Sequence, residues 1–161
     1  MSNLLYYSEI NSMRIMMNSE LITFLFNECN LSHPYETGGI LIGKYSHDQK
    51  SAHITLITKE TSDSRSSFNT FYRGTEGLQD LLDRSWNENR TFYLGEWHYH
   101  PLGENRPSKQ DIKEMKKIMN NENYNCPEPI LIIVGRDLSE HGLGVYLFLE
   151  KDKVIPFSLL P

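Results

Sequence analysis

Two histidines separated by one residue, ahead of a proline and the start of a helix, constrain the fold of this chain more than any other stretch does. The run Gly-Glu-Trp-His-Tyr-His-Pro begins at Gly95 and is typical of a strand, so His98 and His100 project from the same face. Asp111 follows after ten intervening residues, in the first turn of a helix predicted from Ser108. For the three side chains to meet, the end of this strand must lie against the start of that helix.

Two imidazoles and one carboxylate make a ligand set for a metal ion. His98, His100 and Asp111 would supply three ligands and leave a fourth position to water, as at a catalytic zinc site. Fe(II) or Mn(II) would also suit this set. The alternative is a pair of ordinary histidines with Asp111 only capping its helix, because Ser108 and Asp111 have the spacing of a capping box. The two roles compete, since a metal-bound carboxylate is less free to reach back to the cap.

The complete pattern, H-x-H-P followed by S-x-x-D, resembles the signature of the JAMM metalloprotease family, whose domains are also called MPN or JAB. A second segment, Glu-Thr-Gly-Gly-Ile-Leu-Ile-Gly, resembles the E-x-G-G-x-L-x-G segment of that family and places Glu36 62 residues before His98. The resemblance covers nearly the whole domain. Tyr99 is a departure, because the family usually has Ser or Thr there. Since its side chain should point away from the metal, we expect it to affect packing or substrate fit and not ligation.

The resemblance implies a role for each motif residue. His98, His100 and Asp111 would bind zinc (Zn²⁺). Glu36 would not be a ligand; it would orient the attacking water, take its proton as general base and later donate a proton to the leaving amine. Ser108 would donate a hydrogen bond to the oxyanion of the tetrahedral intermediate, in addition to capping its helix.

Glu96 is a rival to Glu36, because it lies on the same strand face as His98 and His100 and could be the base or orient an imidazole. The family match at Glu36 favours Glu36 as the base and leaves Glu96 a supporting or structural role. The remaining histidines have no partner at ligand spacing and are predicted to be ordinary: His33, His47, His53 and His141.

The apolar pattern predicts one α+β domain over residues 1–161, and the resemblance implies the MPN/JAB fold, a central mixed β-sheet flanked by helices. Helices are predicted over residues 19–28, 75–87 and 108–119. Strands are predicted over 12–17, as an edge strand, and over 38–45, 52–61, 92–100, 130–134, 142–150 and 153–157. Residues 61–67 and 120–128 are predicted loops, and 68–73 are predicted to be extended. Trp86 belongs to the apolar stripe of the second helix and is predicted to be in the core.

Composition and charge narrow the classes of function. A net charge of -5 argues against a nucleic-acid surface, which needs a basic face. No apolar run approaches the roughly 18 residues of a membrane span, and no basic, apolar leader precedes the domain, so we expect neither a membrane segment nor a signal peptide. Cys29 and Cys126 are too few and too far apart for a disulfide framework or a thiolate zinc site, which favours free thiols in a bacterial or archaeal cytoplasm.

JAMM peptidases typically cleave isopeptide bonds that join a ubiquitin-like C-terminus to an amine. The resemblance therefore implies an isopeptidase acting on a protein conjugate with an extended C-terminal tail, which would contact residues 61–73 and 120–128. The motifs look like the bacterial branch, above all the isopeptidases of antiphage CBASS operons, where an E1–E2-like enzyme attaches the C-terminus of a CD-NTase to target proteins. Bacterial ubiquitin-like conjugation operons are the second candidate.

Two other hypotheses remain open. A non-catalytic MPN scaffold normally loses metal ligands, and the presence of His98, His100, Ser108 and Asp111 counts against it. A hydrolase of small amides, such as a processing or cysteine-releasing peptidase of a sulfur-carrier protein, would keep the same site.

Overall fold

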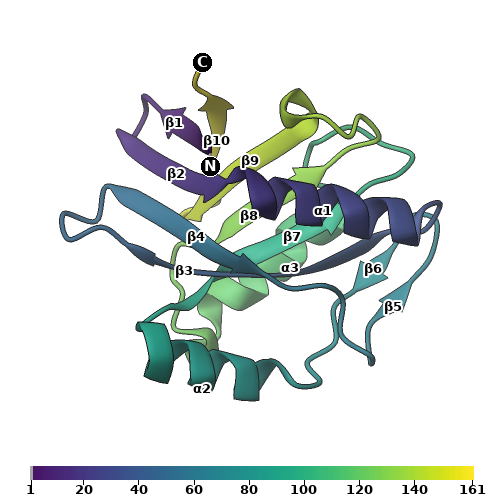
Figure 1. Cartoon of the computed structure of the whole chain (residues 1–161), viewed down its shortest axis with the longest axis horizontal. Coiled ribbons are helices and arrows are strands. Elements are labelled where there is room, and N and C mark those ends of the chain that lie inside the picture. Colours follow the sequence, from purple (N-terminus) through teal and green to yellow (C-terminus); the bar gives the residue numbers. More distant parts are fainter. Residues whose placement is uncertain (1) are drawn as a thin grey trace.

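In the computed structural model, which describes residues 2–161, eight strands form one mixed sheet and three helices pack around it (Figure 1). Along the chain the elements are β1 (Asn3–Ser8), β2 (Met13–Asn18), α1 (Ser19–Ser32), β3 (Thr37–Tyr45), β4 (Ser51–Ile57), β5 (Arg65–Ser66), β6 (Phe71–Tyr72), α2 (Leu78–Asn89), β7 (Phe92–Tyr99), α3 (Lys109–Asn120), η1 (Glu122–Tyr124), β8 (Ile130–Val134), η2 (Glu140–Gly142), β9 (Leu143–Leu149) and β10 (Lys153–Leu159). The predicted α+β class with a mixed sheet flanked by helices is confirmed.

The strands follow the spatial order β1-β10-β9-β8-β7-β3-β4-β2, and β2 pairs in turn with β1, so the sheet closes on itself. The pairs β2–β4 and β7–β8 are parallel and the other neighbours are antiparallel. Because parallel strands need a crossover, the chain passes from β7 through α3 to β8. The start of α3 therefore follows the end of β7 after a short loop, as the strand and helix motif requires.

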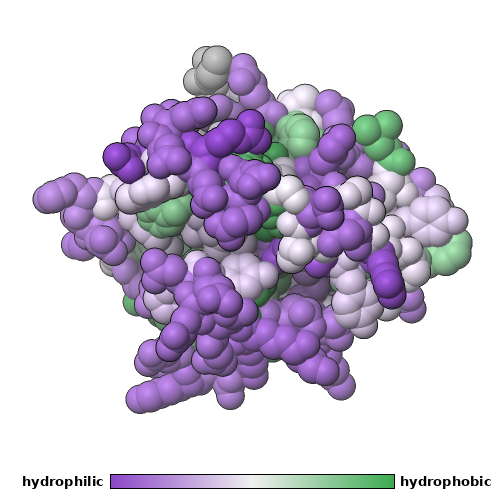
Figure 2. All heavy atoms as spheres, turned by 90° about the horizontal axis from the view of Figure 1, so that it is seen from below, coloured by the Kyte–Doolittle hydropathy of each residue, from purple (hydrophilic) through white to green (hydrophobic). Residues whose placement is uncertain are grey.

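Apolar side chains form a core on each face of the sheet. One core packs α1 against the sheet and contains Leu25, Trp97 and Tyr99; the other packs α2 and α3 and contains Leu78 and Met115. Strands β3, β7 and β8 contribute to both cores, and most of their residues are therefore buried. On the face seen from below in Figure 2, hydrophilic residues cover most of the surface and apolar ones show in recesses and at the edges.

Several predicted boundaries are wrong. The strand predicted at the edge is β2, which lies between β1 and β4, and β1 itself was not predicted because its sequence Leu-Leu-Tyr-Tyr does not alternate between apolar and polar residues. The strand predicted over 52–61 ends at Ile57, and α1 runs four residues beyond its predicted end. The second helix begins at Leu78 and not at residue 75, because Gly77 adopts a left-handed conformation with φ of 77°.

Two predicted loops contain short ordered elements. The predicted loop 61–67 contains strand β5, and the predicted loop 120–128 contains the turn η1. Residues 68–73, predicted to be extended, contain strand β6, which pairs with β5 in a hairpin. Trp86, predicted to be in the core, is 48% exposed and is covered instead by the guanidinium of Arg90, 5.0 Å from its ring. In helix α2, Leu78 is therefore buried more completely than Trp86, which lies at the other end of the apolar stripe. The two cysteines are free, as predicted, and both are buried.

Strands β7 and β8 approach each other closely at Gly95, and this contact predicts the effect of a substitution there. In Gly95→Ala the new Cβ would overlap the carbonyl oxygen of Ile130, and overpacking costs about 1–3 kcal/mol, so we expect the free energy of unfolding to fall by about 3 kcal/mol. Urea denaturation at constant slope measures this change. Gly103→Ala is the control, because its nearest neighbour would be the Cβ of His100 at 3.5 Å, an ordinary contact. Equal stability of Gly95→Ala and the wild type would contradict the packing.

Candidate active site

The pairing of β3 with β7 brings together residues that are far apart in the sequence. Thr37 lies opposite Tyr99 and Gly38 opposite His98, so continuation of this antiparallel register places Glu36 beside His100. The crossover to α3 delivers Asp111 to the same end of β7. Secondary structure alone thus gathers the four side chains that the motifs single out.

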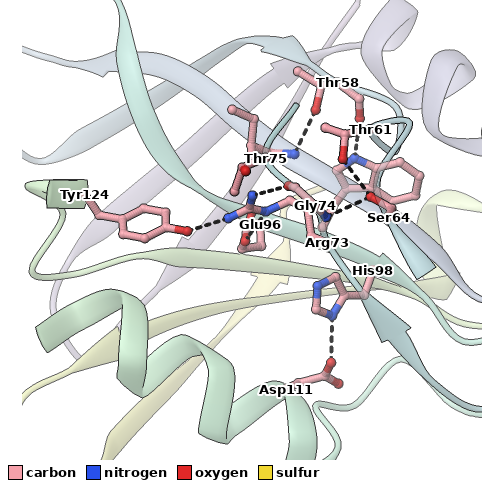
Figure 3. A network of polar contacts seen from close by, with 12 residues as sticks. Thr58, Thr61, Ser64, Arg73, Gly74, Thr75, Glu96, His98, Asp111 and Tyr124 are labelled. Carbon is pink, nitrogen blue, oxygen red and sulfur yellow. Dashed lines mark hydrogen bonds and ion pairs between the residues drawn. The ribbon is translucent and has the colours of Figure 1, made fainter. Parts of the chain in front are cut away.

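The carboxylate of Asp111 contacts both imidazoles. Its Oδ1 lies 2.6 Å from Nδ1 of His98, and its Oδ2 lies 3.1 Å from Nε2 of His100; Figure 3 shows the first of these contacts. All three side chains are buried. Burial by itself raises the pKa of Asp111, but the hydrogen bonds from His100 and His98 outweigh it and hold this pKa well below its usual range. Asp111 is therefore an anion that faces two ring nitrogens.

Ser108 and Asp111 also form the predicted capping box at the start of α3. The Ser108 Oγ accepts a hydrogen bond from the backbone N–H of Asp111 at 3.1 Å, and the Ser108 N–H donates to Asp111 Oδ2 at 2.7 Å. The predicted competition concerned a metal-bound carboxylate and stays a prediction; in this structure the Asp111 carboxylate caps the helix and contacts both histidines. The Ser108 side chain is exposed, and its Oγ acts as acceptor in the cap, so its hydroxyl hydrogen can be donated elsewhere.

Glu36 is half-buried, lies directly before the first residue of β3, and is held through its backbone. Its N–H donates to the carbonyl oxygen of Ser67 at 2.8 Å, and the neighbouring ring of Tyr35 packs on Phe68 with centroids 5.0 Å apart. Burial is the largest cause and raises the pKa of Glu36. The charges of His100 and His98 lower this pKa, and the charge of Asp111 raises it. A raised pKa beside the histidine cluster suits a carboxylate that takes up and returns a proton.

The donor set fits a zinc ion in chemistry but is closed up in this structure. Among residues 2–161 no group of three or more His, Cys, Asp and Glu side chains is spaced as a ready metal site. The reason is the direct contact of Asp111 with His98 and His100 at 2.6 and 3.1 Å, since ligand atoms around a tetrahedral zinc are about 3.3 Å apart.

The other motif residues have different partners. Glu96 does not bond an imidazole; its Oε1 accepts a hydrogen bond from Nε of Arg73 at 2.6 Å. Tyr99 points away from the cluster, as predicted, and its hydroxyl lies 3.0 Å from Nδ1 of His33 on the other face of the sheet. His33, predicted to have no partner at ligand spacing, therefore contacts Tyr99 and takes no part in the cluster.

A cavity of about 250 Å³ adjoins the cluster at His98. Phe71 of the hairpin packs edge-on against the His98 ring, with centroids 5.5 Å apart. The sequence analysis did not single out Arg73 or Tyr124, which line this cavity and hydrogen-bond to each other. Each lies within a segment predicted to contact substrate, but no motif marks either residue, because their partners come from distant parts of the chain.

Comparisons with known proteins show which family the chain resembles along most of its length. A family model described as prokaryotic homologs of the JAB domain matches residues 19–144. A protein of Enterobacter hormaechei subsp. hoffmannii named CD-NTase/cGAS isopeptidase is 42% identical over 123 residues, which cover 76% of this chain and 68% of that protein. A CysO-cysteine peptidase of Mycobacterium tuberculosis is 26% identical over 99 residues, covering 62% of this chain and 64% of the relative.

Solved structures support the fold. The solution structure of a protein from Desulfitobacterium hafniense matches with a TM-score of 0.60 and 17% identity, covering 86% of each chain. A protein from Salinibacter ruber matches with a TM-score of 0.53 and 15% identity, covering 89% of this chain and 87% of the other. At such identities the likeness concerns the fold alone. Separately, no helix within residues 2–161 is long and apolar enough to cross a membrane.

Metal content tests the ligand set directly. The wild type and Glu36→Gln are expected to retain about one zinc ion per chain after dialysis, and His98→Ala none, because removal of one of three protein ligands leaves too few donors. Elemental analysis by mass spectrometry measures the stoichiometry. His53→Ala, on β4, is the matched control and should keep its zinc. Retention of zinc by His98→Ala at the wild-type level would contradict the assignment.

Proposed function

Because the chain belongs to the family of prokaryotic JAB-domain proteins, whose relatives include an isopeptidase and a cysteine peptidase, we propose that it is a zinc-dependent isopeptidase. The observation that carries this proposal is the meeting of Glu36, His98, His100 and Asp111 at one end of β7, beside the capping serine of α3. A non-catalytic scaffold has no need of this complete set, so the geometry favours an enzyme.

His98, His100 and Asp111 would hold the metal. When bound, zinc supplies a Lewis acid that polarises the scissile carbonyl and increases the acidity of water. Asp111 is already anionic and is anchored by the Ser108 N–H, so its position in the ligand set is determined by the fold of α3. The positive end of the α3 dipole stabilises negative charge at this point.

Glu36 and Ser108 would move the proton and stabilise charge. Glu36 takes a proton from the attacking water and later returns it to the leaving amine, a task that suits its raised pKa. The Ser108 hydroxyl donates to the oxygen of the scissile carbonyl as negative charge develops there. Because its Oγ already accepts the Asp111 N–H, the cap orients the hydroxyl for this donation.

The substrate proposed is a protein joined through its C-terminus to a target amine. The name of the Enterobacter relative supports a CD-NTase as that protein. The family resemblance of the motifs adds the proposal of an antiphage CBASS system in the cytoplasm with an E1–E2-like conjugating enzyme. A ubiquitin-like conjugate is the neighbouring possibility. The cavity beside His98 lies between residues 61–73 and 120–128 and is the place proposed for the extended tail.

A second candidate is a processing peptidase that releases an amino acid from a sulfur-carrier or ubiquitin-like protein. The 26% identity to the CysO-cysteine peptidase supports it, although more weakly than the 42% identity supports an isopeptidase. The two differ in substrate: the first cuts a protein conjugate, the second a carrier with a single amino acid on its C-terminus.

The catalytic roles predict a defined kinetic effect. Glu36→Gln is expected to lower kcat on a CD-NTase C-terminal conjugate at least ~100-fold, because a proton-transfer group typically contributes 10²–10⁴-fold. Zinc content should stay unchanged. Glu20→Gln, exposed on α1, is the matched control and should keep wild-type activity. Quantitative gel assays of released target measure the rate.

Substrate choice separates the proposals. Cleavage of the protein conjugate with a slower or absent cleavage of a carrier–cysteine adduct supports the isopeptidase. Efficient cleavage of the adduct, or of a small dipeptide, with an intact conjugate would show that the isopeptidase proposal is wrong.

A further inference from the structure

A buried arginine connects three segments that are distant in the sequence. Arg73, at the end of the hairpin β5–β6, donates through Nε to Glu96 of β7 at 2.6 Å and through one terminal nitrogen to the hydroxyl of Tyr124 in η1 at 2.7 Å. Its other terminal nitrogen donates to the carbonyl oxygen of Gly74 at 2.7 Å. Figure 3 shows the guanidinium between Tyr124 and Glu96, above the His98–Asp111 pair.

The partners of Arg73 are enclosed by the protein around them. Glu96 is only 4% exposed, and its carboxylate is paired with the guanidinium of Arg73 at 2.6 Å. The ring of Tyr124 packs edge-on against Tyr93 of β7, with centroids 5.0 Å apart. A buried charge that loses its only ionic partner is strongly destabilising, so Glu96 requires Arg73 to stay in place.

Hydrogen bonds close the loop that contains the hairpin β5–β6 and Arg73. The carboxylate of Asp63 accepts the backbone N–H groups of Thr75 and Glu76 at 2.9 and 3.0 Å, and the Ser64 Oγ accepts that of Gly74 at 2.9 Å. These bonds join the two ends of the loop. The hairpin therefore behaves as one unit, and Arg73 is its buried attachment to β7 and η1.

Arg73 lies between two cavities and lines both of them. Arg73, Thr75, Asn121 and Tyr124 line both the cavity of about 250 Å³ at His98 and a neighbouring cavity of about 410 Å³. The hairpin and η1 thus face each other across the space beside the catalytic cluster. If the hydroxyl of Tyr124 were lost, the bond that ties one wall to the other would be absent.

We propose that Arg73 is a positioning residue for substrate binding: with Glu96 and Tyr124 it holds the hairpin β5–β6 and the turn η1 as facing walls of the cavity at His98. It thereby determines the affinity for the extended tail and not the rate of bond hydrolysis. This inference rests on the proposed function, since the tail is the ligand that the walls would receive. Glu96 supports Arg73 and is not the general base.

Tyr124→Phe tests the proposal with the least disturbance, because it removes one hydroxyl and keeps the ring on Tyr93. We expect KM for the conjugate to rise about five- to tenfold with kcat within about twofold of wild type, as for loss of binding that is equal in ground and transition states. Amide hydrogen exchange should become faster at residues 65–72 and 122–124. Tyr6→Phe is the matched control, because Tyr6 lies on β1 and its side chain is in the other core. This variant should change neither the kinetic constants nor the hydrogen exchange.

A second variant removes the arginine without leaving a buried charge. Arg73→Met combined with Glu96→Gln is expected to give a similar rise in KM and faster exchange in both walls, whereas Arg73→Met alone risks unfolding. A fall in kcat with unchanged KM would overturn the proposal, because the network would then act on the histidines. A lower melting temperature with unchanged KM, kcat and local exchange would overturn it as well, since the role would be structural only.

Hydrogen exchange separates this inference from the proposed function. If the wild type cleaves no conjugate, the proposed function fails, and faster exchange in Tyr124→Phe still supports Arg73 as the link between the two walls. Unchanged exchange in both variants contradicts the link, whatever the activity.

Discussion

The antiparallel register of β3 and β7 is the constraint on which the candidate site depends. It sets Gly38 opposite His98 and so brings Glu36 to the end of β7. The approach is close enough to require glycine: a Cβ at Gly38 would overlap the backbone oxygen of Trp97 and crowd the rings of Phe71 and His98. The glycines that follow Glu36 are therefore part of the site, because they let the two strands, and with them the carboxylate and the imidazoles, come together.

The crossover from β7 to the parallel strand β8 supplies the other half of the site. A crossover helix that follows a strand begins near the end of that strand, and α3 begins with a capping box whose acidic member is Asp111. One oxygen of this carboxylate faces His98, and the other accepts the Ser108 N–H and faces His100. Capping and contact with both histidines are compatible, because a carboxylate has acceptor positions for several donors.

The cavity beside His98 shows how the scaffold and the substrate-binding segments are joined. Strand β7 carries His98. Two residues earlier the same strand carries Glu96, which accepts a hydrogen bond from Arg73. The hairpin and η1 are short and would have little stability alone. Their attachment to β7 through one buried guanidinium places the proposed binding walls in a defined position relative to His98.

The sequence by itself determined the family resemblance, the α+β class, the order of most elements and the identity of the clustered residues. Alternation of His98 and His100 and the cap at Ser108 are local properties that sequence spacing records. Tertiary structure alone decided the closure of the sheet through β1, the exposure of Trp86, and the partners of Glu96 and Tyr99. These depend on contacts between segments dozens of residues apart, such as Arg73 with Tyr124, which no local pattern of propensity or periodicity contains.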